Sequence, residues 1–239
     1  PVIAGTISGS TNICQGQNSV TYTVPIIANA TSYIWTLPSG ATGTSTTNSI
    51  TVNYGTSAVS GGIEVYGQNS CGVGNASIIP ISVNSFPVSA GQISGTSVVC
   101  QGENSVTYTV PTITNATSYI WSLPSGATGT STTNSITVNY GTSSVSGNIT
   151  VKGNNSCGDG ATSTLAITVN PLPNAAGTIS GNATVCQGQN SIMYAVPSIP
   201  NASSYIWTLP SGSTGSSSSN IITLSYGTSA VSGNITVKG

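Results

Sequence analysis

The sequence predicts an all-β protein built from tandem β-sandwiches, with about seven strands in each 86-residue repeat. Two observations predict this class. Short runs in which apolar and polar residues alternate are separated by clusters of Gly, Asn, Ser and Pro, as is typical of half-buried antiparallel strands. In addition, Trp35, Trp121 and Trp207 are spaced 86 residues apart. A period of that length indicates one small domain per repeat.

The period divides the chain into three units. The segments PVIAG, PVSAG and PNAAG begin equivalent stretches, so we predict repeats at 1–86, 87–172 and 173–239. The first two units are nearly identical in places. The segment LPSGATGTSTTNSITVNYGTS occurs without a change at 37–57 and at 123–143.

The third unit is about twenty residues shorter than the other two, and it lacks a match to the strand segment STLAITVN at 163–170. A sandwich without its last strand has an unpaired edge and an open core groove. We therefore expect the third repeat to be incomplete and the polypeptide to continue beyond Gly239. A strand donated by another subunit is the alternative.

The clearest strand signals are apolar residues at every second position. Such residues share one face in SVTYTVP and SITVNY and in their copies: Val20, Tyr22, Val24, Ile50, Val52, Tyr54, Ile149, Val151, Leu165, Ile167 and Val169. The segment TSYIWTLPSG is the predicted third strand and carries the tryptophan. We predict that Trp35, Trp121 and Trp207 are nearly fully buried core residues. An exposed platform for stacking on sugars is the alternative.

The cysteines follow the same period. Cys14 and Cys71 are 57 residues apart, and Cys100 and Cys157 repeat this spacing. We predict a disulfide within each complete unit, Cys14–Cys71 and Cys100–Cys157, each stabilising its unit by roughly 4 kcal/mol. The partner of Cys186 would fall just beyond the last residue. Disulfides imply an oxidising, extracytoplasmic compartment. Free core thiols are the alternative.

Charged residues make up only 2% of the chain, with two Lys, three Asp and Glu, and no His. We expect no nucleic-acid partner, because there are too few cations to neutralise phosphates. We also expect no membrane insertion, because no run approaches the ~20 apolar residues of a membrane helix and no polybasic segment exists.

The charged residues do not form a repeated site. Glu64 aligns with Thr150, and Lys152 aligns with Tyr66. General acid–base catalysis needs positioned titratable groups, and a serine nucleophile needs a base. Zinc and calcium need ligand sets that the chain does not offer. We therefore predict that the protein is not an enzyme and has no catalytic residue, no metal site and no cofactor.

The segments ATSYIWTLPSGATG, NITVKGNNSCG and ITVNPLP together resemble the PKD-like, immunoglobulin-like repeats of Bacteroidetes surface proteins. These include large adhesins of gliding, Flavobacterium-like bacteria and other cargo of the type IX secretion system. The resemblance covers essentially the whole chain. It departs from the usual PKD pattern at WTLPSG, where those domains carry a WDFGDG-like run. It implies tandem immunoglobulin-like (PKD-like) β-sandwiches in an extracellular, cell-surface spacer or adhesive stalk.

The sequence favours a non-catalytic structural stalk segment of a large repetitive cell-surface adhesin or extracellular filament. Near-identical units of fixed length make a rod, and the short junctions NSFPVSAG and NPLPNAAG contain proline, which limits bending. The expected partners are neighbouring repeats of the same chain, with lateral self-association favoured by the lack of charge repulsion. A polysaccharide-binding module with a glycan surface is the alternative. Ice binding through TGTSTTNSITV is a third hypothesis.

Overall fold

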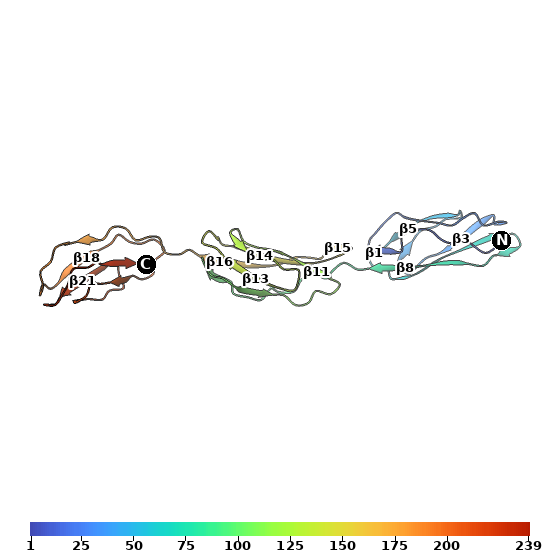
Figure 1. Cartoon of the computed structure of the whole chain (residues 1–239). Coiled ribbons are helices and arrows are strands. Elements are labelled where there is room, and N and C mark those ends of the chain that lie inside the picture. Colours follow the sequence, from blue (N-terminus) through green and yellow to red (C-terminus); the bar gives the residue numbers. More distant parts are fainter.

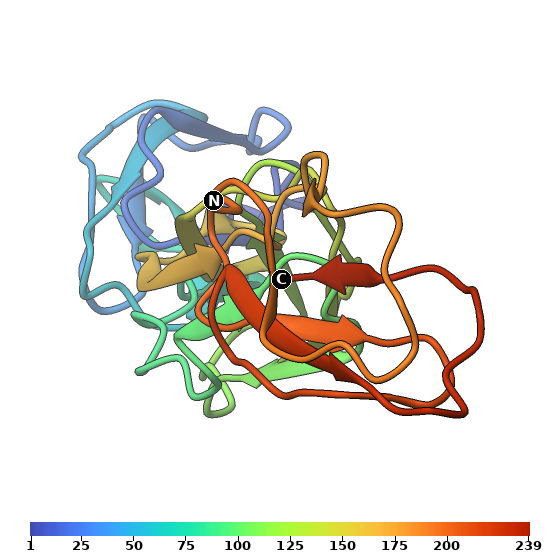
Figure 2. The ribbon, with the colours of Figure 1, turned by 90° about the vertical axis from the view of Figure 1, so that its left-hand side faces the viewer.

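The computed structural model describes residues 1–239 as three β domains in a row, without any helix (Figure 1). The predicted all-β class is therefore confirmed. Strands β1 to β8 form the first domain, β9 to β16 the second and β17 to β22 the third. Viewed end on, the domains are offset from one another (Figure 2). The predicted boundaries near residues 86 and 172 fall in strand-free connections between the domains.

The first domain is a sandwich of two sheets. One sheet has the order β1-β8-β6-β3, with β7 paired to β6, and the other has the order β2-β5-β4. The strands are β1 (Asn12–Cys14), β2 (Val20–Thr23), β3 (Ser32–Thr36), β4 (Ala41–Thr42), β5 (Ser49–Tyr54), β6 (Gly61–Asn69), β7 (Gly72–Val73) and β8 (Ser77–Asn84). Compared with the seven strands expected, the short β7 is an extra element, and it closes the hairpin that holds Cys71.

The second domain repeats this topology. Its strands are β9 (Val98–Cys100), β10 (Val106–Thr109), β11 (Ser118–Ser122), β12 (Ala127–Thr128), β13 (Ser135–Tyr140), β14 (Gly147–Asn155), β15 (Gly158–Asp159) and β16 (Ser163–Asn170). The third domain contains β17 (Ser180–Gly181), β18 (Ile192–Ala195), β19 (Ile206–Thr208), β20 (Ser213–Thr214), β21 (Ile221–Tyr226) and β22 (Thr236–Lys238).

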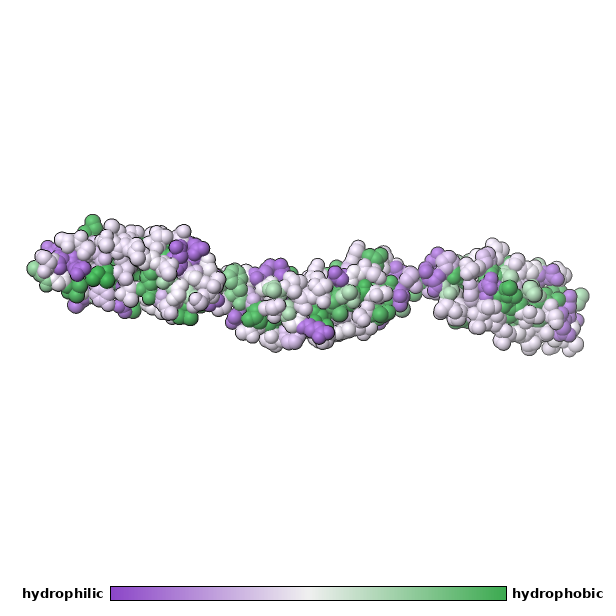
Figure 3. Space-filling view, turned by 180° about the vertical axis from the view of Figure 1, so that it is seen from behind, coloured by the Kyte–Doolittle hydropathy of each residue, from purple (hydrophilic) through white to green (hydrophobic).

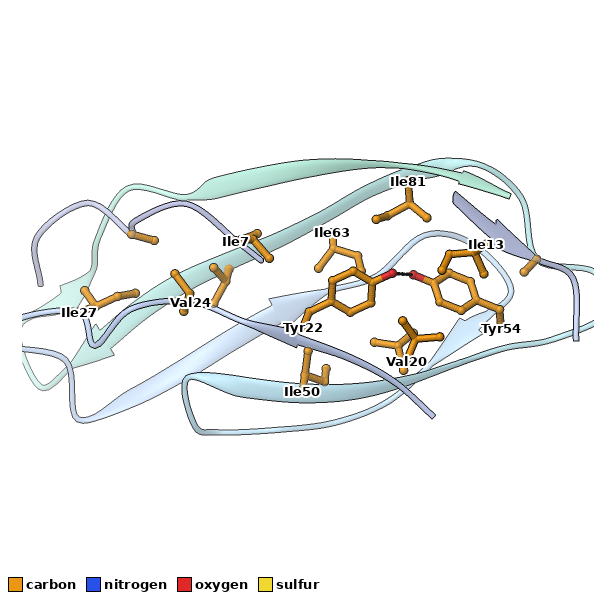
Figure 4. Packing of buried hydrophobic residues seen from close by; sticks show 14 residues of the cluster. Ile7, Ile13, Val20, Tyr22, Val24, Ile27, Ile50, Tyr54, Ile63 and Ile81 are labelled. Carbon is orange, nitrogen blue, oxygen red and sulfur yellow. Dashed lines mark hydrogen bonds between the residues drawn. The ribbon is translucent and has the colours of Figure 1, made fainter. Parts of the chain in front are cut away.

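The core lies between the two sheets of each domain. The alternation predicted for β2 and β5 is confirmed. Tyr22 on β2 and Val52 and Tyr54 on β5 are fully buried, whereas their neighbours along each strand within the alternating stretch face solvent. Figure 4 shows Tyr22 and Tyr54 pointing toward each other in the middle of this core, with Ile63 and Ile13 beside them. Aromatic side chains bury a large apolar area per residue. The tyrosine pair therefore occupies the centre of the core between the two sheets.

The tyrosine hydroxyls form a short hydrogen-bonded chain. Tyr22 Oη donates to the carbonyl oxygen of Ser10 at 2.7 Å, and Tyr54 Oη lies 2.8 Å from Tyr22 Oη and donates to it. A buried hydroxyl needs such a partner, because leaving it unpaired costs about 1–3 kcal/mol. A Cβ on Gly9 would lie 2.2 Å from the Tyr22 ring, so only glycine lets the backbone approach the ring here. The second and third domains contain equivalent hydrogen bonds between their two tyrosine hydroxyls and a backbone carbonyl.

The predicted near-complete burial of the tryptophans is wrong. Trp35, Trp121 and Trp207 are each partly buried and pack against the side of the core. The reason is topological, because β3 is the edge strand of its sheet. From that edge, Trp35 Nε1 donates to the carbonyl oxygen of Thr47 at 2.9 Å, in the loop before β5 of the other sheet. The tryptophan thus closes the open side of the sandwich, while the tyrosine pair fills its centre.

The third domain has no counterpart of β8 and β16, and an open groove lies in that place. The groove has a volume of about 880 Å³ and is lined in part by Ile179, Val185, Tyr194 and Ile235. The buried core cluster contains only 4 residues here, against 14 in the first domain. Residues around Val185 also form no strand, because the partner that β1 and β9 use in their domains is missing. The third domain is thus the least packed.

We expect Tyr108→Phe to destabilise the second domain more than Tyr140→Phe. Tyr108 Oη donates to the carbonyl oxygen of Thr96 at 2.9 Å and accepts from Tyr140, so its removal leaves two buried groups unpaired. Tyr140→Phe removes only one hydrogen bond. The expected losses in unfolding free energy are about 2–4 and about 1 kcal/mol. Hydrogen exchange of peptides from β10 and β13 measures both, and an equal loss would contradict the proposed donor direction.

We expect the third domain to lose stability as the pH rises from about 10 to 12. Burial, aided by the hydrogen bond with Tyr194, raises the pKa of Tyr226 from 10.0 to about 12. An acid whose pKa is raised by folding contributes stability that is complete below its unfolded pKa and is lost as the pH passes its folded value. The tyrosinate absorbance of wild type minus Tyr226→Phe should titrate near pH 12. A difference that titrates near pH 10 would contradict the burial of this hydroxyl.

Candidate functional site: the junction between neighbouring domains

Each domain receives the chain at one end and releases it at the other (Figure 1). We call the end with the β6–β7 hairpin and Cys71 the upstream end of the first domain. The end where β8 finishes at Asn84 is its downstream end. Cys14 lies at this downstream end, because β1 pairs in parallel with β8 and Cys14 is opposite Asn84. The downstream end of one domain therefore faces the upstream end of the next.

The predicted disulfides within the units, Cys14–Cys71 and Cys100–Cys157, are wrong. The structure contains one disulfide, between Cys14 of the first domain and Cys157 of the second, with 5.5 Å between the two Cα atoms. The cause is the length of β6 (Gly61–Asn69), whose eight residue steps span about 26 Å between the two ends of the domain. A disulfide needs Cα atoms about 4.4–6.8 Å apart, so the cysteines of one domain cannot meet.

Polar contacts surround the disulfide. Asn155 precedes Cys157 by two residues, and its Oδ1 accepts the Cys157 backbone N–H at 2.8 Å. Its Nδ2 donates to the carbonyl oxygens of Ser85 in the connection, at 2.8 Å, and of Asn115, at 2.7 Å. Asn115 Nδ2 in turn donates to the carbonyl oxygen of Phe86 at 3.3 Å. The upstream end of the second domain thus binds the connecting chain at two successive carbonyls.

An apolar residue in each connection lies beside the downstream turn of the domain that it leaves, with its side chain nearly half exposed. Phe86 lines a small hollow together with Cys14 and the turn that follows it. Phe86 also lies against Gly158, where an added Cβ would come within 3.2 Å of the ring. Its counterpart Leu172 donates its backbone N–H to Gln101 Oε1 at 3.2 Å. The connection is therefore held to the domains on both sides.

The junction between the second and third domains repeats the polar contact but not the disulfide. Asn201 Nδ2 donates to the carbonyl oxygen of Leu172 at 3.4 Å, which matches the contact of Asn115 with Phe86. Cys100, the counterpart of Cys14, is exposed and free, as are Cys71 and Cys186. The two junctions therefore share the asparagine contact to the connecting chain, while the disulfide and the contacts of Asn155 occur at the first junction.

The family model for PKD-like domains matches residues 1–81, 86–167 and 172–239. The chain belongs to the PKD-like domain family. PKD-like domains are generally non-catalytic, and the match confirms the PKD-like part of the resemblance seen in the sequence. No curated protein sequence matches the chain.

Several solved structures are similar to the three PKD-like domains. FdeC, an Escherichia coli adhesin, is 15% identical, with 94% of this chain and 88% of that chain covered and a TM-score of 0.35. The C-terminal fragment of intimin, in complex with the intimin-binding domain of its translocated receptor, is 17% identical, with 75% and 66% covered and a TM-score of 0.41.

Four of the five charged side chains of the PKD-like domains make local contacts. Lys152 on β14 forms an ion pair with Asp159 on the neighbouring β15, and the hydrogen bond from Lys152 holds the pKa of Asp159 below its usual value. In the first domain Tyr66 Oη donates to Glu64 Oε2 at 2.6 Å, which raises the pKa of Tyr66. Glu103 Oε2 accepts the backbone N–H of Cys100 at 2.9 Å. The Lys152–Asp159 pair joins neighbouring strands, the Tyr66–Glu64 hydrogen bond lies within β6, and the Glu103 contact closes a turn.

The structure brings together no group of three or more His, Cys, Asp and Glu side chains that could hold a metal ion. It contains no helix with the length and apolarity needed to cross a membrane. The best-defined candidate site is the disulfide-linked junction between the first two domains. It combines a covalent bond with amide contacts to the connecting chain. The cysteine spacing and the NNSCG segment were its only signals in the sequence.

We expect non-reducing peptide mapping of the oxidised chain to show a Cys14–Cys157 cross-link and to leave Cys71 and Cys100 open to alkylation. Cys157→Ser should release Cys14 as a thiol, because no other cysteine lies within reach of it. Cys71→Ser is the matched control and should leave the cross-link unchanged. A peptide that joins Cys14 to Cys71 would contradict the structure.

Proposed function

We propose that the chain is a non-catalytic stalk segment of a large, repetitive cell-surface adhesin or extracellular filament. The junction between the first two domains carries this proposal. There the connecting chain and the Cys14–Cys157 disulfide run side by side, so two covalent links join one domain to the next. A binding or catalytic role has no need of a second covalent link between domains, whereas an extended spacer that must resist bending does.

The linear arrangement supports the same role. Because each domain receives and releases the chain at opposite ends, every added repeat lengthens the array (Figure 1). The hydrogen bonds of Asn115 and Asn201 to the connecting residues recur at both junctions, so the spacing between domains is built into each repeat. Uniform spacing is what a stalk requires.

The surface of the array supports self-association of such stalks. Its space-filling view shows residues of intermediate hydropathy with small, scattered apolar and polar areas (Figure 3). Net charge is only −1, so neighbouring rods would repel each other weakly. Lateral contact between stalks is therefore part of the proposal, with no nucleic acid and no membrane-inserted segment involved.

The proposed location is the cell surface. A disulfide between domains persists in an oxidising compartment outside the cytoplasm. The resemblance of the YIWTLPSG and NNSCG segments to repeats of Bacteroidetes surface proteins supports an origin in such an adhesin.

The glycan-binding alternative receives less support. It needs an exposed aromatic face in each repeat, and Trp35 instead packs against the core and uses its indole N–H on the Thr47 carbonyl. The equivalent bonds of Trp121 and Trp207 have lengths of 2.9 and 3.0 Å. A structural role of the tryptophan accounts for its recurrence.

The stalk proposal is tested by the bending of single molecules in negative-stain electron microscopy. We expect a narrow distribution of angles at the first junction and a broader one at the second, because only the first carries a disulfide. Cys157→Ser should broaden the first distribution and leave the second unchanged, so the second junction serves as the control within each molecule. If the first junction bends as freely with the disulfide as without it, the disulfide does not stiffen the array and the proposal loses its main support.

A further inference from the structure

Three cysteines remain free, and all three are exposed at the ends of domains. Cys71 lies in the upstream hairpin of the first domain, as Cys157 does in the second. Cys100 and Cys186 come just before a turn at the downstream ends of the second and third domains, in the positions that Cys14 occupies in the first domain. Each free thiol is therefore the counterpart of one half of the existing disulfide.

The downstream cysteines are held in the same way whether or not they are bonded. The backbone N–H of Cys14 donates to Gln17 Oε1 at 3.0 Å, and that of Cys186 donates to Gln189 Oε1 at 2.9 Å. Cys100 makes the same contact with the Glu103 carboxylate. The residue after each cysteine also anchors the turn, since Gln15, Gln101 and Gln187 each donate Nε2 to a backbone carbonyl 43 residues later in the sequence. The free thiols at these ends are thus positioned like the bonded one.

The upstream end of the third domain approaches Cys100 as the second domain approaches Cys14. Gly153 lies against Pro87, where an added Cβ would be 3.0 Å from the Pro87 side chain, and four residues later Cys157 forms the disulfide. Gly239 is the counterpart of Gly153 and lies against Pro173 at 3.1 Å by the same measure. In Figure 1 this end of the chain lies on the side of the third domain that faces the second. Strand β22, which ends just before Gly239, is therefore directed at the second junction.

We propose that the downstream cysteine of each repeat bonds to the upstream cysteine of the following repeat. Cys100 and Cys186 are then each one half of a junction whose other half is the NNSCG-type cysteine of an adjoining PKD-like repeat. Cys71 is the complementary half for a CQG-type cysteine of a repeat on its upstream side. The result is a row of domains in which a disulfide crosses every junction and no disulfide lies within a domain.

The bond forms by ordinary thiol–disulfide exchange with a small disulfide such as oxidised glutathione. One cysteine thiolate attacks this disulfide and releases one glutathione thiol. The second cysteine thiolate then attacks the mixed disulfide and releases the other. Two protein thiols are oxidised to one disulfide, and oxidised glutathione is reduced to two thiols with the two protons. The pairing is independent of the stalk function, because it concerns which sulfur atoms meet and not what the array does.

The test uses the full chain extended after Gly239 by a second copy of residues 154–172, which supplies the missing hairpin cysteine and last strand. The extended chain is refolded with oxidised and reduced glutathione and mapped under non-reducing conditions. We expect the added cysteine to be linked to Cys100, with Cys186 left as a thiol. A link from the added cysteine to Cys186, within one repeat, would overturn the proposal, and so would an added cysteine that stays reduced.

Two matched variants keep the result interpretable. In the extended chain, Cys100→Ser should leave the added cysteine reduced and should not divert it to Cys186. An extension that carries serine in place of its cysteine should still fill the groove beside Tyr194 and slow hydrogen exchange of β18 and β21. Slowed exchange together with a reduced cysteine in the parent extension would show a folded repeat that does not staple, and would contradict the proposal.

Discussion

The architecture depends on one constraint: the chain enters each domain at one end and leaves at the opposite end. Parallel pairing of β1 with the end of β8 places Cys14 where the chain departs, and the long β6 carries Cys71 to the other end. The row of domains follows from this, and so does the impossibility of a disulfide within a domain. The same constraint brings Cys14 to Cys157, since the downstream end of one domain meets the upstream end of the next.

Much of the fold could be predicted from the sequence, because alternation reports directly which residues face the core. Tyr22, Val52 and Tyr54 were assigned correctly for this reason. The cysteine pairing could not be predicted, because the 86-residue repeat makes Cys157 an equivalent of Cys71, and periodicity does not say which of the two lies near Cys14. The partial burial of Trp35 could not be predicted for a related reason. Alternation gives the face of a strand, but it does not show that β3 is an edge strand.

The polar groups of the PKD-like domains serve the fold and its junctions. The tyrosine hydroxyls satisfy one another inside the sandwich. The amides of Asn115 and Asn155 bind the connecting chain, and the carboxylates of Glu64 and Asp159 pair with side chains within their own sheet. The composition alone indicates a structural role for these groups, but it does not show that asparagine and cysteine together make the junction. That information lies in the spatial order of the domains.

The scarcity of ionised side chains has a consequence for the medium in which the array is placed. Dissolved ions screen interactions between charges over about 10 Å at 0.1 M salt and over about 3 Å at 1 M. Hydrogen bonds inside a sandwich and a disulfide between domains are hardly affected by this screening. With two lysines and three acidic residues in 239, the array has few interactions that screening can weaken. The contacts that hold its domains together are therefore almost independent of ionic strength, from fresh water to brine.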